Sequence, residues 1–248
     1  MRPTFIYVLA VVIFCLDAGQ PAFAQELGGS NEIFAVPSTS GQIIQLFGLV
    51  TVLAIAPAIL IMVTSFPRFI IVFSILRAGM GLQSTPANII LISLALFMTF
   101  YVMSPVMDRA WENGLQPLLE QEINEAEALD EISGPFREFM EANVRESDVA
   151  LFVDLAEERG QTVEVAGQVD LRVLIPAFMI SEIRRGFTIG FLVILPFLVI
   201  DLIVATIIMA MGMMMLPPSV VSLPLKILFF VTIDGWNILV GSLVRSVA

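Results

Sequence analysis

The fold of this chain is decided by a stretch that begins Pro176-Ala-Phe-Met-Ile-Ser-Glu-Ile-Arg-Arg-Gly-Phe187 and runs to Pro224. It continues as a long apolar run with a single carboxylate, Asp201, and closes with Met209-Ala-Met-Gly-Met-Met-Met-Leu-Pro-Pro218. Charged side chains among residues this hydrophobic are costly and are usually functional. We therefore interpret the rest of the chain as the support that holds this stretch in place.

The composition places the protein at a membrane. Of its 248 residues, 58 % are hydrophobic and 14 % are charged, and the mean hydropathy is +0.93. Soluble domains are about 45–50 % apolar and about 25 % charged. The net charge of −11 is concentrated in residues 108–170, which carry 17 acids and 4 arginines, a net charge of −13. One acidic, hydrophilic block thus interrupts an apolar chain.

Several chemistries are excluded by what the sequence lacks. It has no histidine, and its single cysteine, Cys15, falls in a segment that we expect to be removed. Disulfides, zinc sites and cysteine or histidine catalysis are therefore excluded, and an acidic block without a basic patch argues against nucleic-acid binding. We expect no enzyme, no cofactor and no metal. An intramembrane enzyme or ion-coupled transporter is the alternative class, but the chain has no P-loop and no internal repeat of transporter halves.

Hydropathy and charge divide the chain into five segments. We predict a cleaved signal peptide (1–24), an extracytoplasmic linker (25–42), a first hydrophobic helical hairpin (43–107), an acidic periplasmic helical insertion (108–170) and a second hydrophobic helical hairpin with a methionine gate loop (171–248). The signal is indicated by Arg2, a short apolar core and Ala22-Phe-Ala24. A first membrane anchor is its alternative, although the core is short for a span of about 20 residues.

The first hairpin is expected to contain two apolar helices. One falls within Ile43–Phe66, and the second covers Asn88–Ser104, with Pro86 near its start. Arg68 and Arg77 lie between them and fit a cytoplasmic turn under the positive-inside rule.

The acidic insertion is expected to fold. Residues 135–144 place apolar side chains on one helical face, and a second helix starts at Ser147 and Asp148 and is closed by Gly160. A solvated acidic loop is the alternative.

The second hairpin holds the candidate polar residues. Asp170 is expected to cap its first helix, in which Glu182 and Arg185 are three residues apart and can meet on one face. This pair is either an intrahelical ion pair or a polar contact between helices or subunits. The following 30 residues, 187–216, exceed one straight span, and we expect a break or kink at Pro196, Asp201 or Gly212.

Two further ionisable residues follow in the next apolar segment. Lys226 is its one basic residue and a candidate partner for Asp201, and Asp234 is a second candidate polar point.

The methionine cluster has three interpretations. Five methionines fall within seven residues, and they are Met209, Met211, Met213, Met214 and Met215. Because methionine side chains adapt their shape, they could seal a pore and deform around a passing chain. Apolar filler and a copper site are the alternatives, although a copper site usually needs further soft ligands.

Four segments together resemble the FliP family of flagellar type III export-gate proteins and its injectisome relatives. They are Phe69–Arg77 leading into Leu94–Val106, Pro176–Phe191, Leu195–Asp201, and Met209–Pro218 with Ser222–Lys226. The resemblance covers Ile43 to the C-terminus. Thr188 departs from it, because the family usually has a longer, often charged side chain there.

The resemblance implies a fold and a function. It implies an all-α, membrane-associated protein of hydrophobic helical hairpins with kinked helices and a hydrophilic helical insertion, assembling into a helical pore ring. The ring is a homopentamer joined by FliQ and FliR that conducts unfolded flagellar subunits, in the inner cell membrane and the flagellar basal body. Arg184 and Arg185 lie at the start of the second hairpin, which the predicted topology places outside the cytoplasm, so they violate the positive-inside rule. The resemblance accounts for this, because it implies that the helices are held largely above the membrane plane.

The resemblance also implies roles for the candidate residues. By position, Glu182, Asp201 and Lys226 match charged residues in ring packing, and Met209 to Met215 match a methionine gasket under the pore. The signal peptide and the acidic insertion favour the flagellar branch, and an injectisome export-gate subunit is the alternative.

Overall fold

The computed structural model describes residues 50–51, 54–55, 58–82, 85–160, 164–165, 168–212 and 217–247. The chain divides into two compact units, residues 1–60 and 61–248. In the first unit the described residues are helical. The predicted signal peptide and linker lie outside the described residues, and so do residues 43–49, 52–53 and 56–57 of the first predicted span.

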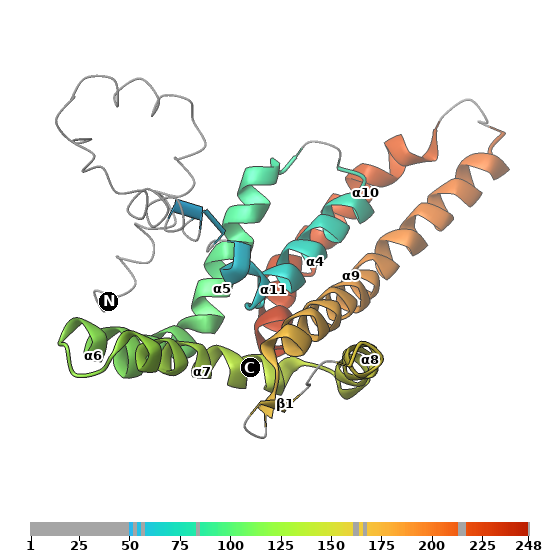
Figure 1. Ribbon diagram of the computed structural model, residues 1–248. Coiled ribbons are helices and arrows are strands. Elements are labelled where there is room, and N and C mark those ends of the chain that lie inside the picture. Colours follow the sequence, from blue (N-terminus) through green and yellow to red (C-terminus); the bar gives the residue numbers. More distant parts are fainter. Residues whose placement is uncertain are drawn as a thin grey trace, which may run out of the picture. The chain divides into compact units, whose positions relative to one another are not determined.

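The second unit is built from helices (Figure 1). In chain order these are α4 (Phe66–Gly79), α5 (Asn88–Ala110), the π-helix η1 (Trp111–Leu115), α6 (Gln116–Leu119), α7 (Glu125–Asn143), α8 (Glu146–Glu157), α9 (Leu171–Ala210), α10 (Pro218–Thr232) and α11 (Gly235–Arg245). A short antiparallel pair, β1 (Glu164–Val165) and β2 (Gln168–Val169), precedes α9, with Glu164 opposite Val169. The predicted all-α fold with a hydrophilic helical insertion is confirmed.

Two helical segments of the described residues are long and apolar enough to cross a membrane. They are Asn88–Leu119 and Leu171–Ala210, and the bent pair α10–α11 is a third if it counts as one span. The bend between α10 and α11 is 65°. A kinked helix was predicted, and in the second hairpin the sharp bend lies at Ile233 and Asp234.

Helix α4 occupies a region that the sequence assigned to a turn. The residues between Arg68 and Arg77 are helical, and the side chains of Phe69, Val72 and Phe73 are completely buried. These residues belong to one apolar core that also takes side chains from α5, α9, α10 and α11. The prediction of a simple turn was therefore wrong, because this apolar run is buried by its neighbours on several sides.

Helix α9 is one helix of 40 residues, about 60 Å long at 1.5 Å per residue. The predicted break at Pro196 or Asp201 is absent, since both residues lie inside the helix. An internal proline removes one backbone hydrogen bond and crowds the preceding turn, and the packing of α9 along α4 and α10 offsets this cost (Figure 1). Gly212, with φ of +73°, follows the C-cap residue Met211 and fits the predicted stop there.

The acidic block folds against the first third of α9. Asn124 caps α7 by accepting a 2.9 Å hydrogen bond from the Glu127 amide, so this helix begins ten residues before the predicted start at Pro135. Met140 of α7 lies in a small core with Leu174 and Phe178 of α9. The amphipathic helices therefore have the partner surface that they require, and the solvated-loop alternative is wrong.

Candidate functional site

Helices α4 and α9 approach closely through glycines. A Cβ atom on Gly190 would lie 2.6 Å from Ile75 Cδ1, and one on Gly186 would lie 3.1 Å from Ile71 Cβ. The sequence Gly186-Phe-Thr-Ile-Gly190 is a G-x-x-x-G motif, which allows two helices in an apolar setting to pack closely. This motif was readable from the sequence and was missed.

A buried ion pair joins the beginning of α4 to α9. Both side chains, Arg68 and Glu182, are 0 % exposed. The Arg68 Nε donates to Glu182 Oε2 at 2.9 Å, and Nη2 donates to Oε1 in a second, very short contact. This bidentate geometry is the strongest form of an arginine–carboxylate contact.

Arg68 also holds the end of α11. Its Nη1 donates to the backbone oxygen of Ser246 at 2.5 Å and to the Ser246 hydroxyl at 3.1 Å. Ser246 is the C-cap of α11, where carbonyl groups lack partners within the helix and attract a positive charge. We call Arg68, Glu182 and Ser246 the arginine centre.

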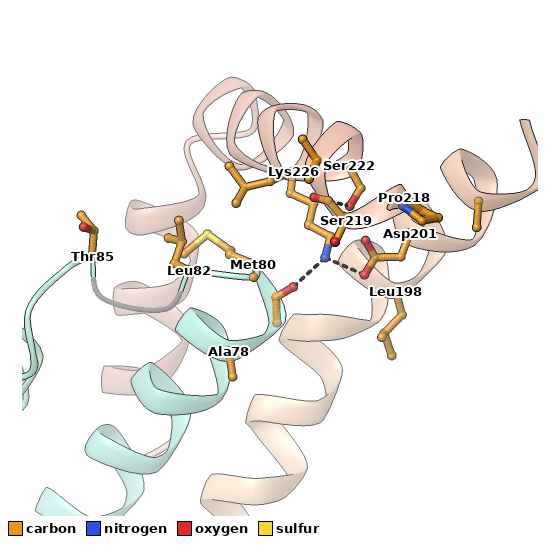
Figure 2. Close-up of a pocket in the computed structure, with 15 residues that line it drawn as sticks. Ala78, Met80, Leu82, Thr85, Leu198, Asp201, Pro218, Ser219, Ser222 and Lys226 are labelled. Carbon is orange, nitrogen blue, oxygen red and sulfur yellow. Dashed lines mark hydrogen bonds and ion pairs between the residues drawn. The ribbon is translucent and has the colours of Figure 1, made fainter. Parts of the chain in front are cut away.

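A second ion pair lies further along α9. Lys226 Nζ, on α10, donates to Asp201 Oδ2 at 2.5 Å and to the Gly79 carbonyl at 3.0 Å (Figure 2). Gly79 is the last residue of α4, so Lys226 caps that helix as Arg68 caps α11. We call Lys226, Asp201 and Gly79 the lysine centre.

The lysine centre lies at the wall of a cavity. The cavity has a volume of about 740 Å³ and is also lined by Thr85, Ser219 and Ser222. The Lys226 side chain is 6 % exposed, whereas that of Asp201 is 39 % exposed. The carboxylate of this centre therefore keeps partial contact with solvent or with another molecule.

The two centres share one design. In each, a carboxylate of α9 pairs with a cation from another helix, and that cation also binds the carbonyl end of a third helix. Glu182 and Asp201 are 19 residues apart in α9, which corresponds to about 28 Å, near the roughly 30 Å thickness of a hydrocarbon core. The two centres therefore fix α4, α10 and α11 to α9 at two points that are 19 residues apart along this helix.

Arg185 does not take the partner that the sequence indicated. Glu182 binds Arg68, and Arg185 instead makes a 3.4 Å contact from Nη1 to Asn143 Oδ1 in the acidic block. Of the two interpretations of this pair, the intrahelical ion pair is not formed, whereas Glu182 does make a polar contact between helices, with Arg68 of α4.

A further polar contact joins the acidic block to α9. The Ser181 hydroxyl donates to Asp148 Oδ2 at 2.7 Å, and the amide of Arg145 donates to the same hydroxyl at 3.1 Å. Arg184 lies 3.4 Å from Asp148 Oδ1. Asp148 was expected only as a first-turn residue of α8, and nothing in local sequence indicated its partner 33 residues away.

The two arginines assigned to a cytoplasmic turn have different environments. Arg68 is completely buried in the arginine centre, so it is no turn residue. Arg77 lies in the last turn of α4 and binds the Asn88 side chain and, at 3.5 Å, the Pro86 carbonyl. Arg77 therefore joins the two ends of the segment between α4 and α5.

The methionine cluster is only partly described. Met209, near the end of α9, and Met211, its C-cap, are 57 % and 64 % exposed, whereas Met213, Met214 and Met215 lie outside the described residues. The gate role of the five methionines therefore stays a prediction.

The arrangement is suited to assembly. Large apolar side chains are exposed along α9 and α10, among them Phe187, Phe191, Leu198, Leu202, Val220 and Leu228. In the described part of the chain, no group of three or more acidic, histidine or cysteine side chains could hold a metal ion. Glu182, Asp201 and Lys226 bind partners in their own chain, and the exposed apolar faces are available to lipid or other subunits.

Comparison with known proteins gives one consistent family. Residues 49–243 match the sequence model of the FliP family. The chain is 69 % identical over 240 residues to the flagellar biosynthetic protein FliP of Rhizobium meliloti strain 1021, covering 97 % of both chains. It is 70 % identical over 209 residues to that of Agrobacterium fabrum strain C58, covering 84 % of this chain and 85 % of the relative. The Caulobacter vibrioides protein of the same name is 46 % identical over 245 residues, covering 99 % of this chain and 91 % of the relative.

Proposed function

The chain belongs to the FliP family, and we propose that it is a core subunit of the flagellar type III protein export gate. The observation that carries this proposal is the 69 % identity, over 97 % of both chains, to a protein named for flagellar biosynthesis. The chain is a membrane-associated component of flagellum assembly, and we assign it a structural role in export without a catalytic step. The flagellar names of all three relatives favour this function over an injectisome gate.

The proposed gate is a homopentameric ring joined by FliQ and FliR. The exposed apolar side chains of α9 and α10 support this part of the proposal, because patches of this extent are usually covered by lipid or by another protein chain. We place the ring in the inner membrane and basal body, with the acidic block facing the periplasm. Unfolded flagellar subunits would pass through its centre.

Within this ring we assign the charged centres to the inside of each subunit, and not to the packing between subunits that the resemblance implied. Glu182, Asp201 and Lys226 bind partners in their own chain, which supports a role in making each subunit rigid before assembly. Arg184 and Arg185, whose described contacts are long, are the better candidates for polar contacts between subunits.

We assign the methionine cluster to the gate of the pore. The exposure of Met209 and Met211 is compatible with this role, and flexible thioether side chains suit a seal that must adapt to different segments. Deletion of Met213 to Met215 should leave ring assembly intact and should let small ions leak. The leak can be measured as ion flux across the membrane of cells expressing the ring, and an ion-tight deletion variant would contradict the gate assignment.

Native mass spectrometry tests the assembly. The full chain would be co-expressed with its FliQ and FliR neighbours and purified in a mild detergent. We expect a ring of several copies that gains two further kinds of subunit. A stable monomer that binds neither neighbour would contradict the proposal. It would favour the alternative class, an ion-coupled transporter in which Asp201 and Lys226 act within one chain.

A further inference from the structure

The second hairpin contains one acid that no described residue of the chain neutralises. Residues 171–247 carry three acids, of which Glu182 and Asp201 belong to the two ion centres. The third, Asp234, accepts a 3.1 Å hydrogen bond from the neutral side chain of Asn237. Among the residues that the structure describes, no cation pairs with Asp234.

The surroundings of Asp234 are apolar. The residue lies at the break between α10 and α11, a pair that is together apolar and long enough for a broken membrane span or a re-entrant loop. Its side chain is exposed, and so are the nearby apolar side chains Leu228, Val231, Ile233, Trp236 and Ile238. A carboxylate at such a position is costly unless a positive group covers it.

The backbone at Asp234 accounts for only part of the charge, because its place as the N-cap residue of α11 favours a negative charge only weakly at an exposed position. Its φ of 53° and ψ of 49° lie in the left-handed region, and its side chain does not cap α11. The bend is fixed by its neighbours, because a Cβ on Gly235 would strike the Phe230 ring and the rings of Phe230 and Trp236 pack edge to face at 5.3 Å. Glycine or asparagine would adopt this turn as well without a charge.

We propose that Asp234 receives a lysine or arginine from an apolar helix of a companion subunit, meaning a different chain of the gate. The inference rests on the proposed function, because it requires a gate of more than one kind of chain. The exposed apolar side chains beside Asp234 would pack on the companion helix, and the ion pair would fix its register. A desolvated pair of this kind contributes to specificity as well as to affinity.

A second copy of this chain is a poor source of the positive charge. Its only lysine, Lys226, is nearly buried and already binds two acceptors. Arg68 is completely buried in the arginine centre. The other arginines of the second hairpin lie in the first half of α9 or, as Arg245, next to Ser246 in sequence. Arg77 of α4 already binds Asn88 and the Pro86 carbonyl. Charge complementarity therefore favours a companion chain.

The test compares charge variants in the co-expressed complex. Asp234→Asn keeps the size of the side chain and its tolerance of the left-handed conformation, but it removes the charge. Glu157→Gln is the control, because Glu157 is exposed at the end of α8 in the acidic block. Each variant is purified by a tag on this chain, and the companion subunits recovered with it are measured by quantitative mass spectrometry. Thermal unfolding of each variant alone reports on folding.

We expect Asp234→Asn to melt like the wild-type chain and to recover at least tenfold less of one companion, and Glu157→Gln to leave recovery unchanged. Asp234→Lys should lose the same companion, and exchange of one lysine or arginine in that companion for aspartate should restore it. Normal recovery with Asp234→Asn overturns the inference. A loss of the companion that is explained by unfolding of the variant also overturns it. The same holds if only a substitution in a second copy of this chain restores recovery of the companion. If the wild-type chain recovers no companion, the proposed function itself fails.

Discussion

The arginine centre makes a quantitative prediction about Glu182. Glu182→Gln keeps the shape of the side chain but removes the negative charge from beside a completely buried guanidinium, which then has only neutral acceptors, the glutamine oxygen and the two Ser246 oxygens. Removing one partner of a buried ion pair typically costs about 3–5 kcal/mol, because the remaining charge is uncompensated. We expect Glu182→Gln to destabilise the isolated chain by about 3 kcal/mol or more.

The assay is equilibrium unfolding of the purified chain in a mild detergent, followed by far-ultraviolet circular dichroism. Glu138→Gln is the matched control, since Glu138 pairs with Arg109 at 2.6 Å with side chains 65 % and 48 % exposed. An exposed pair of this kind contributes about 0–1 kcal/mol. The double variant Arg68→Met with Glu182→Leu should recover most of the loss, because no charge then remains buried. A Glu182→Gln chain as stable as the control would refute the reasoning and return Glu182 to a role in assembly alone.

Three further substitutions test the packing of α9. Gly190→Ala should lower the free energy of unfolding by about 1–3 kcal/mol, because the new Cβ would lie 2.6 Å from Ile75 Cδ1. The control is Gly241→Ala, whose new Cβ would have no neighbour within 4 Å and which should be neutral or stabilising in the same unfolding assay. Ser181→Ala should expose the acidic block to limited proteolysis, since it removes the 2.7 Å hydrogen bond to the buried Asp148, a loss of about 1–3 kcal/mol; unchanged cleavage rates would contradict this. Asp201→Asn should speed amine-reactive labelling of Lys226, the only lysine in the chain, and an unchanged labelling rate would show that the Gly79 carbonyl alone holds the ammonium group.

Local sequence rules located several boundaries correctly. Asp170 was expected to cap a helix, and its side chain accepts a 2.8 Å hydrogen bond from the Arg172 amide at the start of α9. Asn88 was expected to open the second apolar helix, and α5 begins there. These features depend on neighbouring residues, which a single sequence displays directly.

Rules that use only neighbouring residues could not predict the long-range contacts. Arg68 and Glu182 are 114 residues apart, and Arg68 was assigned to a turn because charge was counted without knowledge of its partner. The continuity of α9 through Pro196 depends on packing against α4 and α10, which overrides the local tendency to break. The pairing of Asp201 with Lys226 was easier to anticipate, because each is nearly alone among apolar residues and needs an opposite charge.

The central claim, a role in flagellar protein export, is tested most directly by secretion. The measurement is the amount of flagellar subunit in the culture medium and in the cytoplasm of a strain that lacks this chain. We predict that secreted subunits disappear while cytoplasmic subunits persist, and that plasmid-borne wild-type chain restores secretion. Secretion at the normal level without the chain would contradict its role in the export gate.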